Sequence, residues 1–249
     1  MKIARFEHKG KIVWGSVHED VIYVLAGDIF EGASETGDKV PLKNIKLLPP
    51  VSPPKIIGIG LNYKLHIKES PFPAPEVPMI FLKAPTSVIG HLDTIILPDS
   101  NKVDYEGELA IVIGKRAKNV QENEALSYVL GCSIVNDVSA RDYHGQDKSF
   151  ARSKGVDTFC PFGPYIVTGL NPDNLKIETR LNGKTVQSSN TNDLLFKVHQ
   201  LISFASRYMT LLPGDLIATG TPAGVGPLTK GDVIEVELEG VGILKNFVS

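Results

Sequence analysis

The chain has 249 residues, of which 42% are hydrophobic and 22% charged, and its formal net charge is −2. This composition is typical of a globular protein that buries a sizeable core, and the small negative charge argues against a nucleic-acid or anionic-membrane surface. No apolar run has the length of a signal-peptide core or a membrane span. The two cysteines, Cys132 and Cys160, are too few for a disulfide framework. We therefore expect reduced thiols, a cytoplasmic location and a small-molecule ligand.

The first 50 residues alternate short β-like segments with turns, and we expect a small N-terminal β domain. The strand-like segments are 2–6, 11–17 and 21–25, and the aromatic residues expected to fill a small core are Trp14, Tyr23 and Phe30. The stretch 49–54, Pro-Pro-Val-Ser-Pro-Pro, cannot continue a helix or a central strand. This boundary gives two domains, residues 1–50 and a larger catalytic domain over residues 51–249.

A strand is expected over 55–60, and the following segment 63–69 suits either a short helix or a mobile loop. The Gly58-x-Gly60 at the end of this strand lacks the third glycine and the ribose-binding acid of a dinucleotide loop. His66 and Glu69 are three residues apart and would share a face of such a helix. The proline-rich segment 70–78 forbids regular structure, and such a segment can act as a lid beside a site.

The remaining elements are mostly short strands. We expect strands over 80–83, 94–97 and 164–167, a strand pair around Asn182-Gly183, and alternation again over 233–238. Helices are expected over 122–130 and from Leu194 to Ala205, where apolar residues recur with the helical period, and 143–155 is expected to be a connection. Many short strands with few helices and no βαβ rhythm predict a predominantly β, mixed α+β fold of packed sheets.

One acidic motif enters a buried strand. Glu106 and Glu108 run into the apolar segment Leu109–Ile113, and side chains two apart on a strand share a face. Like charges that close oppose ionisation unless a cation lies between them, although Glu-x-Glu also occurs on the solvated face of antiparallel sheets. Asp137 ends a second β-rich segment, 131–137. Three carboxylates without His or Cys suit Mg²⁺, or Mn²⁺ or Ca²⁺.

Three motifs together resemble the fumarylacetoacetate hydrolase family, of the small acylpyruvase or 2-hydroxyhepta-2,4-diene-1,7-dioate isomerase-like type. They are Asp104-Tyr105-Glu106-x-Glu108, Asn136-Asp137-x-Ser139-Ala140-Arg141-Asp142, and Thr219-Gly220-Thr221-Pro222-x-Gly224-Val225-Gly226. The resemblance covers about residues 50–249. It implies a fold of rolled, packed β-sheets and a homodimer. It also implies a divalent-metal enzyme that acts on 2-oxo or 2,4-dioxo acids, with Glu106, Glu108 and Asp137 as the metal ligands.

The same resemblance implies roles for further residues, each of which would otherwise be an ordinary surface or loop residue. His66 would act as base toward water, Glu69 would orient it, and Lys154 would pair with the substrate carboxylate or protonate an enolate. Arg141, Gly220 and Thr221 would contact the substrate. Where many relatives carry Gln after Ala-Arg-Asp, this chain has Tyr143-His144, and His144 is the candidate replacement.

The activity expected first is Mg²⁺-dependent hydrolysis of a C–C bond in acylpyruvate-like 2,4-dioxo acids through a metal-stabilised enolate. The alternative is decarboxylation or isomerisation of 2-oxo or 2-hydroxymuconate-type diacids in aromatic catabolism, including decarboxylation or tautomerisation of oxaloacetate. A sugar-acid dehydratase and a non-catalytic dicarboxylate-binding relative are further alternatives. The presence of both His66 and Glu69 argues against a pure binder, which needs no base.

Overall fold

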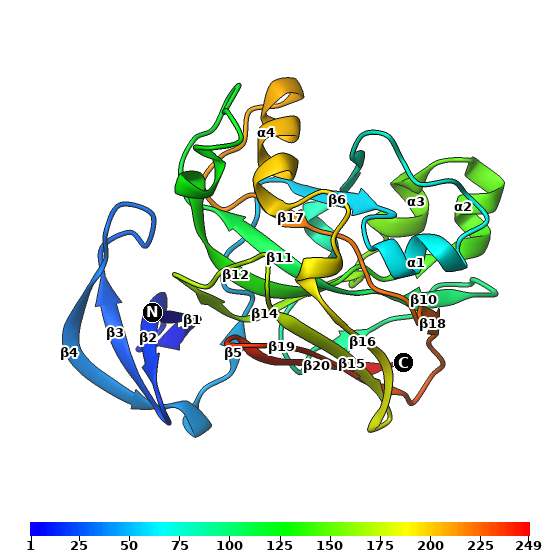
Figure 1. Cartoon of the computed structure of the whole chain (residues 1–249). Coiled ribbons are helices and arrows are strands. Elements are labelled where there is room, and N and C mark those ends of the chain that lie inside the picture. Colours follow the sequence, from blue (N-terminus) through cyan, green and yellow to red (C-terminus); the bar gives the residue numbers. More distant parts are fainter.

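The computed structural model describes residues 1–249, and its elements are twenty strands, four short α-helices and four 3₁₀ turns (Figure 1). The predicted predominantly β fold is confirmed. Both cysteines are buried free thiols, as expected. None of the helices combines the length and apolar character needed to cross a membrane.

The largest sheet carries the N-terminal strands at one end and the central strands of the molecule at the other. Its order is β4 (Ser34–Pro41), β3 (Val21–Ala26), β2 (Lys11–His18), β1 (Lys2–His8), β14 (Cys160–Val167), β12 (Val129–Asn136), β11 (Gly107–Ile113), β17 (Leu216–Ala218), β6 (Ile56–Gly60) and β7 (Met79–Lys83). Two short strands pair at its side, β5 (Leu47–Leu48) with β1 and β8 (Val88–Ile89) with β14. The N-terminal strands join the rest through β1, which pairs antiparallel with β14.

Two smaller sheets complete the β structure. One has the order β13 (Ser139–Ala140), β10 (Val103–Tyr105) and β18 (Gly226–Pro227). The other has the order β16 (Lys184–Asn190), β15 (Lys176–Leu181), β19 (Val233–Leu238), β20 (Gly242–Val248) and β9 (Thr94–Ile95). Asn182 and Gly183 join β15 to β16 with φ of 51° and 78°, the left-handed pair that a two-residue hairpin turn requires. The predicted strand pair is therefore confirmed.

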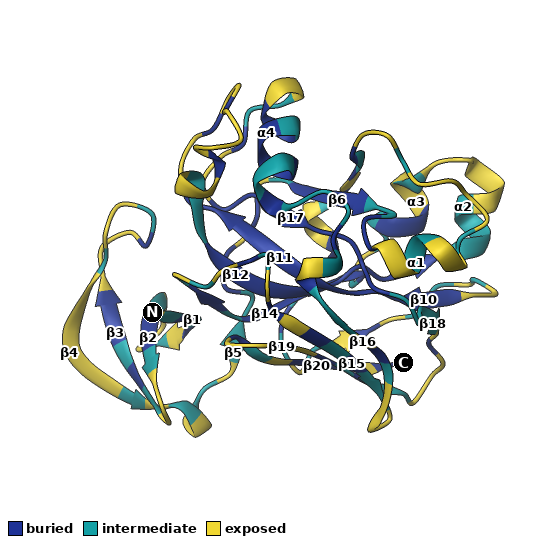
Figure 2. Ribbon diagram, in the orientation of Figure 1, coloured by how far each residue is buried: buried dark blue, intermediate teal, exposed yellow.

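Strand β11 lies at the centre of the core. All seven of its residues are buried (Figure 2), and the five from Leu109 to Ile113 alternate between two hydrophobic clusters because successive strand side chains point to opposite faces. Leu109, Ile111 and Ile113 pack in a cluster with α4 (Val198–Tyr208), and Ala110 and Val112 pack in a second cluster on the other face. A strand buried on both faces explains why this segment reads as one continuous apolar run.

The helices differ from the sequence-based expectations in three places. Helix α4 begins at Val198 rather than Leu194, because the 3₁₀ turn η4 (Thr191–Asp193) and a non-helical backbone at Leu194 precede it. The helix expected over 122–130 was wrong: only the turn η3 (Ala125–Tyr128) forms there, and Val129 already starts β12.

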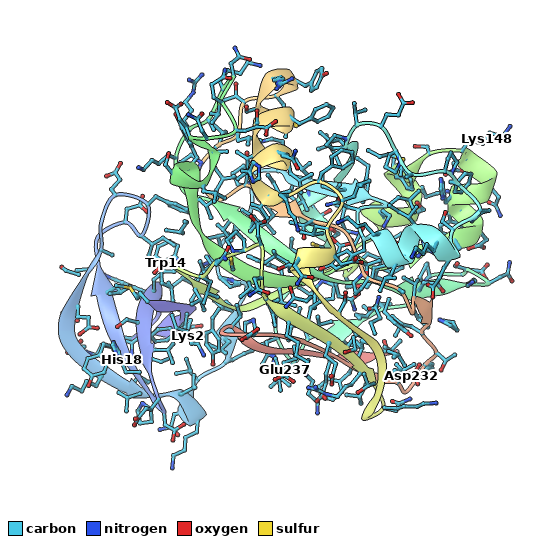
Figure 3. All side chains as sticks on the ribbon, in the orientation of Figure 1. Lys2, Trp14, His18, Lys148, Asp232 and Glu237 are labelled. Atoms are coloured by element: carbon cyan, nitrogen blue, oxygen red, sulfur yellow. The ribbon has the colours of Figure 1, made fainter.

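The connection expected over 143–155 was also wrong, because two helices form there. They are α2 (Arg141–Asp147) and α3 (Phe150–Gly155), and Lys148, between them, has a φ of 51°. Figure 3 places Lys148 at the outer edge of the molecule. Two further short turns are η1 (Leu42–Asn44) and η2 (Pro85–Ser87). Of the two alternatives for segment 63–69, a short helix or a loop, the structure has the helix, α1 (Lys64–Glu69).

The N-terminal core also differs from expectation. Its buried residues are Ala4, Phe6, Ile22 and Val24. Trp14 and Phe30 instead pack against the cluster that contains Ala110 and Val112, and the Trp14 indole donates a 2.9 Å hydrogen bond to the Pro50 carbonyl. Strand β4 had no counterpart in the sequence reading because nearly all of its residues are exposed, so it lacks an alternating apolar pattern.

Candidate active site

The three acids predicted as metal ligands converge where β11 and β12 pair. Glu106 lies between β10 and β11, Glu108 is the second residue of β11, and Asp137 follows β12. Gly107 pairs with Asn136, and the Asp137 amide donates a 2.8 Å hydrogen bond to the Glu106 carbonyl. One carboxylate oxygen from each acid lies within 4.8 Å of the other two, and all three residues are buried.

Three basic side chains contact two of these acids. Lys154 Nζ donates to Glu106 Oε2 at 2.8 Å and to Asp137 Oδ2. Lys83 Nζ, fully buried on β7, donates to Asp137 Oδ1 at 2.6 Å. Arg141 donates to Glu106 through Nη2 and to Asp104 Oδ2 through Nε at 2.7 Å. Although burial raises the pKa of Glu106, the charges and hydrogen bonds of Lys154 and Arg141 outweigh it and hold that pKa well below its ordinary value.

Glu108 is the acid that contacts no basic side chain. Its hydrogen-bond partner in the protein is the Gly220 amide, which donates to Oε2 at 2.8 Å. Burial, followed by the charges of Asp137 and Glu106, raises the pKa of Glu108 well above its ordinary value. A buried trio of hard oxygen donors that lacks positive charge at one member fits a divalent cation such as Mg²⁺.

A cavity of about 340 Å³ opens over the acid trio, and the helices α1, α2 and α3 lie on this side of the molecule (Figure 1). Its lining includes all three acids together with the predicted site residues His66, Glu69, Arg141, His144, Lys154 and Thr221. Gly220 is not part of this lining, since its amide is directed at Glu108. The structure thus gathers nine of the ten predicted residues around one cavity and places the tenth directly behind it.

Helix α1 supplies one wall. The His66 side chain is 19% exposed, and its Nδ1 is buried without a hydrogen-bond partner, 3.9 Å from Glu69 Oε2. Burial lowers the pKa of His66, and the negative charges of Glu106 and Glu69 only partly offset this effect. The imidazole is therefore neutral near pH 7, the state in which it can accept a proton.

Helices α2 and α3, together with strand β7, supply an aromatic wall. The His144 ring lies 4.3 Å from the Phe150 ring, which lies 4.9 Å from Phe81, and Lys154 Nζ is 4.7 Å from the centre of Phe81. Burial lowers the pKa of His144, as do the charges of Arg141 and Lys154. Although burial lowers the pKa of Lys154, Asp137 and Glu106 outweigh it, so that its ammonium is held in the charged form.

The loop after β17 supplies the last wall through Thr221. Gly220 has a φ of 102°, and a Cβ there would lie 2.8 Å from Asn62 Cβ, so only glycine fits this approach. Glu69 Oε2 accepts a 3.3 Å hydrogen bond from the Gly224 amide, which ties the loop to α1.

Sequence reasoning missed several residues that build the site. Lys83, Phe81 and Phe150 contact predicted site residues, yet none was singled out as functional. Lys83 carried a usable signal, because it is a lysine at the end of a strand whose other residues are apolar. Phe81 and Phe150 carried none, because an apolar residue on a strand or helix is ordinarily part of the core.

Comparison with known proteins identifies the family. The model described as "Fumarylacetoacetate (FAA) hydrolase C-terminal" matches residues 55–249, and the model described as "Rv2993c-like, N-terminal" matches residues 1–50. Oxaloacetate tautomerase Fahd2a, mitochondrial, of Rattus norvegicus is 44% identical over 222 residues, which cover 84% of this chain and 71% of that protein.

Two solved structures extend the likeness to the whole fold. The 5-carboxymethyl-2-hydroxymuconate delta-isomerase of Mycobacterium smegmatis is 43% identical with a TM-score of 0.94, and the coverage is 100% of this chain and 99% of that one. The fumarylacetoacetate hydrolase of Exiguobacterium antarcticum is 38% identical with a TM-score of 0.91, again over 100% and 99%. The chain therefore belongs to the fumarylacetoacetate hydrolase family of enzymes.

Proposed function

We propose that this enzyme interconverts the keto and enol forms of a short 2-oxo diacid such as oxaloacetate, with a divalent cation held by Glu106, Glu108 and Asp137. The observation that carries the proposal is the imidazole of His66, whose Nδ1 is buried without a hydrogen-bond partner, in the same cavity as the buried acid trio. Keto–enol exchange requires one base of this kind and a means of stabilising negative charge on oxygen. The rat relative is named an oxaloacetate tautomerase, an activity of the same class.

The acid trio is the cation-binding part of the proposal. A divalent cation held by Glu106, Glu108 and Asp137 would supply positive charge that stabilises the negative charge developing on the keto oxygen. Lys83 and Lys154 hold both oxygens of Asp137, so its carboxylate is kept in one orientation. The oxygen-only donor set suits Mg²⁺, and equally Mn²⁺ or Ca²⁺.

His66 is the proposed proton carrier. Its imidazole takes the proton from C3 of the keto acid, the C3–H electron pair forms the C2–C3 double bond, and the C2=O π pair moves onto the oxygen. That oxygen takes a proton from water to give the enol, and the imidazolium returns its proton to the hydroxide left behind. The reverse sequence restores the keto form. Glu69 Oε2 lies 3.9 Å from Nδ1, where its negative charge stabilises the imidazolium that forms.

Arg141 is the proposed partner of the substrate carboxylate farther from the keto group. Its Nε and Nη2 donate to Asp104 and Glu106, which leaves Nη1 without a partner in the protein while the side chain is 30% exposed. His144 lines the same cavity and can add a polar contact. A cavity of about 340 Å³ lies at the small end for ligand sites and so favours a short diacid.

The second candidate is the hydrolytic cleavage of an acylpyruvate-like 2,4-dioxo acid. His66 and Glu69 share one face of α1 and both line the cavity, an arrangement that can activate water. We rank it second because the 3.9 Å separation exceeds hydrogen-bond length and Glu69 already accepts from the Gly224 amide. The homodimer implied by the family resemblance stays a prediction that sedimentation velocity can test.

The experiment follows the enol of oxaloacetate by its ultraviolet absorbance, with Mg²⁺ and with EDTA, while pyruvate and CO₂ are assayed in parallel. We expect Mg²⁺-dependent acceleration without either product. Release of CO₂ would indicate decarboxylation instead, and formation of pyruvate plus a second acid from acetylpyruvate would indicate hydrolysis. His66→Ala should lose on the order of 10²-fold or more in rate, whereas the control His199→Ala, on α4 away from the cavity, should not.

A further inference from the structure

Gln187 is a buried polar residue of β16 that lies behind the cavity rather than in its lining. It is 1% exposed and makes three hydrogen bonds. Its Oε1 accepts from the Gly107 amide at 3.1 Å, and its Nε2 donates to Thr221 Oγ1 at 2.9 Å and to the Pro222 carbonyl at 2.8 Å. Gln187 therefore connects the segment Glu106–Glu108 at the start of β11 with the loop that carries Thr221.

The backbone fixes which end of the Gln187 amide faces Thr221. The Gly107 N–H can only donate and the Pro222 carbonyl can only accept. Rotating the amide by 180° would set its NH₂ against the Gly107 N–H and its oxygen against the Pro222 carbonyl, so both contacts would become repulsive. The Nε2 group is consequently directed at Thr221, and both of its protons are used.

The orientation of Gln187 in turn determines the polarity of the Thr221 hydroxyl. A hydroxyl has one proton and two lone pairs. Thr221 Oγ1 donates its proton to the Gly107 carbonyl at 3.0 Å and accepts from Gln187 Nε2 with one lone pair. The second lone pair is left to accept one more hydrogen bond. Because Thr221 lines the cavity, a ligand there can donate it.

We propose that Gln187 is a positioning residue that makes the Thr221 hydroxyl a hydrogen-bond acceptor toward the cavity, so that the site prefers a ligand with an O–H or N–H donor there. This inference deepens the proposed function and rests on it for the identity of the substrate. The enol form of a 2-oxo diacid carries an O–H at C2, where the keto form has only an acceptor. The hydroxyl would thus favour the enol form.

Two small inhibitors of similar shape test the polarity without turnover. Oxalate presents only acceptors, whereas oxamate replaces one carboxylate with an amide that donates. Each is titrated by calorimetry into the full-length protein at saturating Mg²⁺, and the ratio of the two dissociation constants is compared among variants. Using this ratio cancels losses that affect both ligands equally.

Removing the acceptor should change the two ligands differently. Thr221→Val should weaken oxamate about threefold to tenfold, the range for one hydrogen bond, and leave oxalate within about twofold. Gln187→Met frees the hydroxyl to turn and donate, so oxalate should bind more tightly relative to oxamate by a similar factor. Thr221→Ser keeps the hydroxyl and should restore the parent ratio, and the exposed control Gln121→Met should not alter it.

The proposal is overturned if Thr221→Val weakens oxalate as much as oxamate, or if oxamate fails to bind the parent protein. Should Gln187→Met fail to fold, the Thr221 series decides the polarity alone. The outcome is separable from the proposed function. If the ratio of the oxalate and oxamate dissociation constants changes among the variants as expected but the parent lacks tautomerase activity, only the proposed activity is contradicted. If the parent is a tautomerase but the ratio does not change among the variants, only the role of Gln187 is contradicted.

Discussion

Glu108→Gln should make the metal-free protein more stable while it removes the response to Mg²⁺. Glu108 is 2% exposed, contacts no basic side chain, and lies within 4.8 Å of a carboxylate oxygen of Glu106 and of Asp137. At this distance each like-charge repulsion is about 3.5 kcal/mol for an effective dielectric constant of 20. The glutamine keeps an oxygen for the Gly220 amide, so the hydrogen bond survives the substitution.

The expected gain is smaller than the two repulsions together, because Lys154 attracts Glu108 and a buried acid can escape by taking up a proton. We expect the free energy of unfolding to rise by about 1–3 kcal/mol at pH 7 in EDTA, or the melting temperature by about 3–10 °C. The raised pKa of Glu108 means that the folded parent binds the extra proton. The advantage of the variant should therefore grow as pH rises above the unfolded pKa of about 4.3 and vanish below it.

The assay is thermal unfolding with EDTA and with excess Mg²⁺, and the control is Glu31→Gln, an exposed acid outside the cavity lining. At a hundredfold excess over the dissociation constant, Mg²⁺ should stabilise the parent by about 2.7 kcal/mol and leave the variant unchanged. The difference in free energy of unfolding between variant and parent should therefore shrink or change sign when Mg²⁺ replaces EDTA. A variant that is less stable than the parent in EDTA, or that Mg²⁺ still stabilises, would refute the charge argument.

Three further predictions concern the surrounding residues. Lys83→Met removes one partner of a buried ion pair and should lower the free energy of unfolding by about 3–5 kcal/mol in urea titrations, whereas a loss below 1 kcal/mol would argue against the pairing. Because burial lowers the pKa of His66, activity should fall with decreasing pH only below about 6.5, and a limb centred above that value would contradict a neutral His66 base. Arg141→Met should raise KM for a diacid more than for a 2-oxo monoacid, and equal increases would count against Arg141 as the partner of the second carboxylate.

The acid trio could be predicted from the sequence because its chemistry is local. Glu106 and Glu108 sit two apart at the start of a continuous apolar run, and strand periodicity alone puts them on one face. Asp137 was added because it ends a second β-rich segment, the family resemblance implied all three acids as ligands, and pairing of β11 with β12 is what brings Asp137 beside the other two. Short-range pattern and one strand pairing were enough for this part of the site.

The supporting residues could not be predicted in the same way. Lys83 reaches Asp137 across 54 positions of sequence, and Gln187 reaches Thr221 across 34, so neither contact leaves a local pattern. The helices α2 and α3 are short and polar on the outside, and Gly145 interrupts any helical period. Tertiary contact, here Phe150 against Phe81, decides their structure rather than propensity.

Calorimetric titration of Mg²⁺ into EDTA-treated protein tests the central claim most directly. We expect one site per chain in the parent, and binding at least a hundredfold weaker in Glu106→Gln and in Asp137→Asn, each of which loses one of three charged ligands. Unchanged affinity in either variant, or no binding by the parent, would contradict a cation held by Glu106, Glu108 and Asp137.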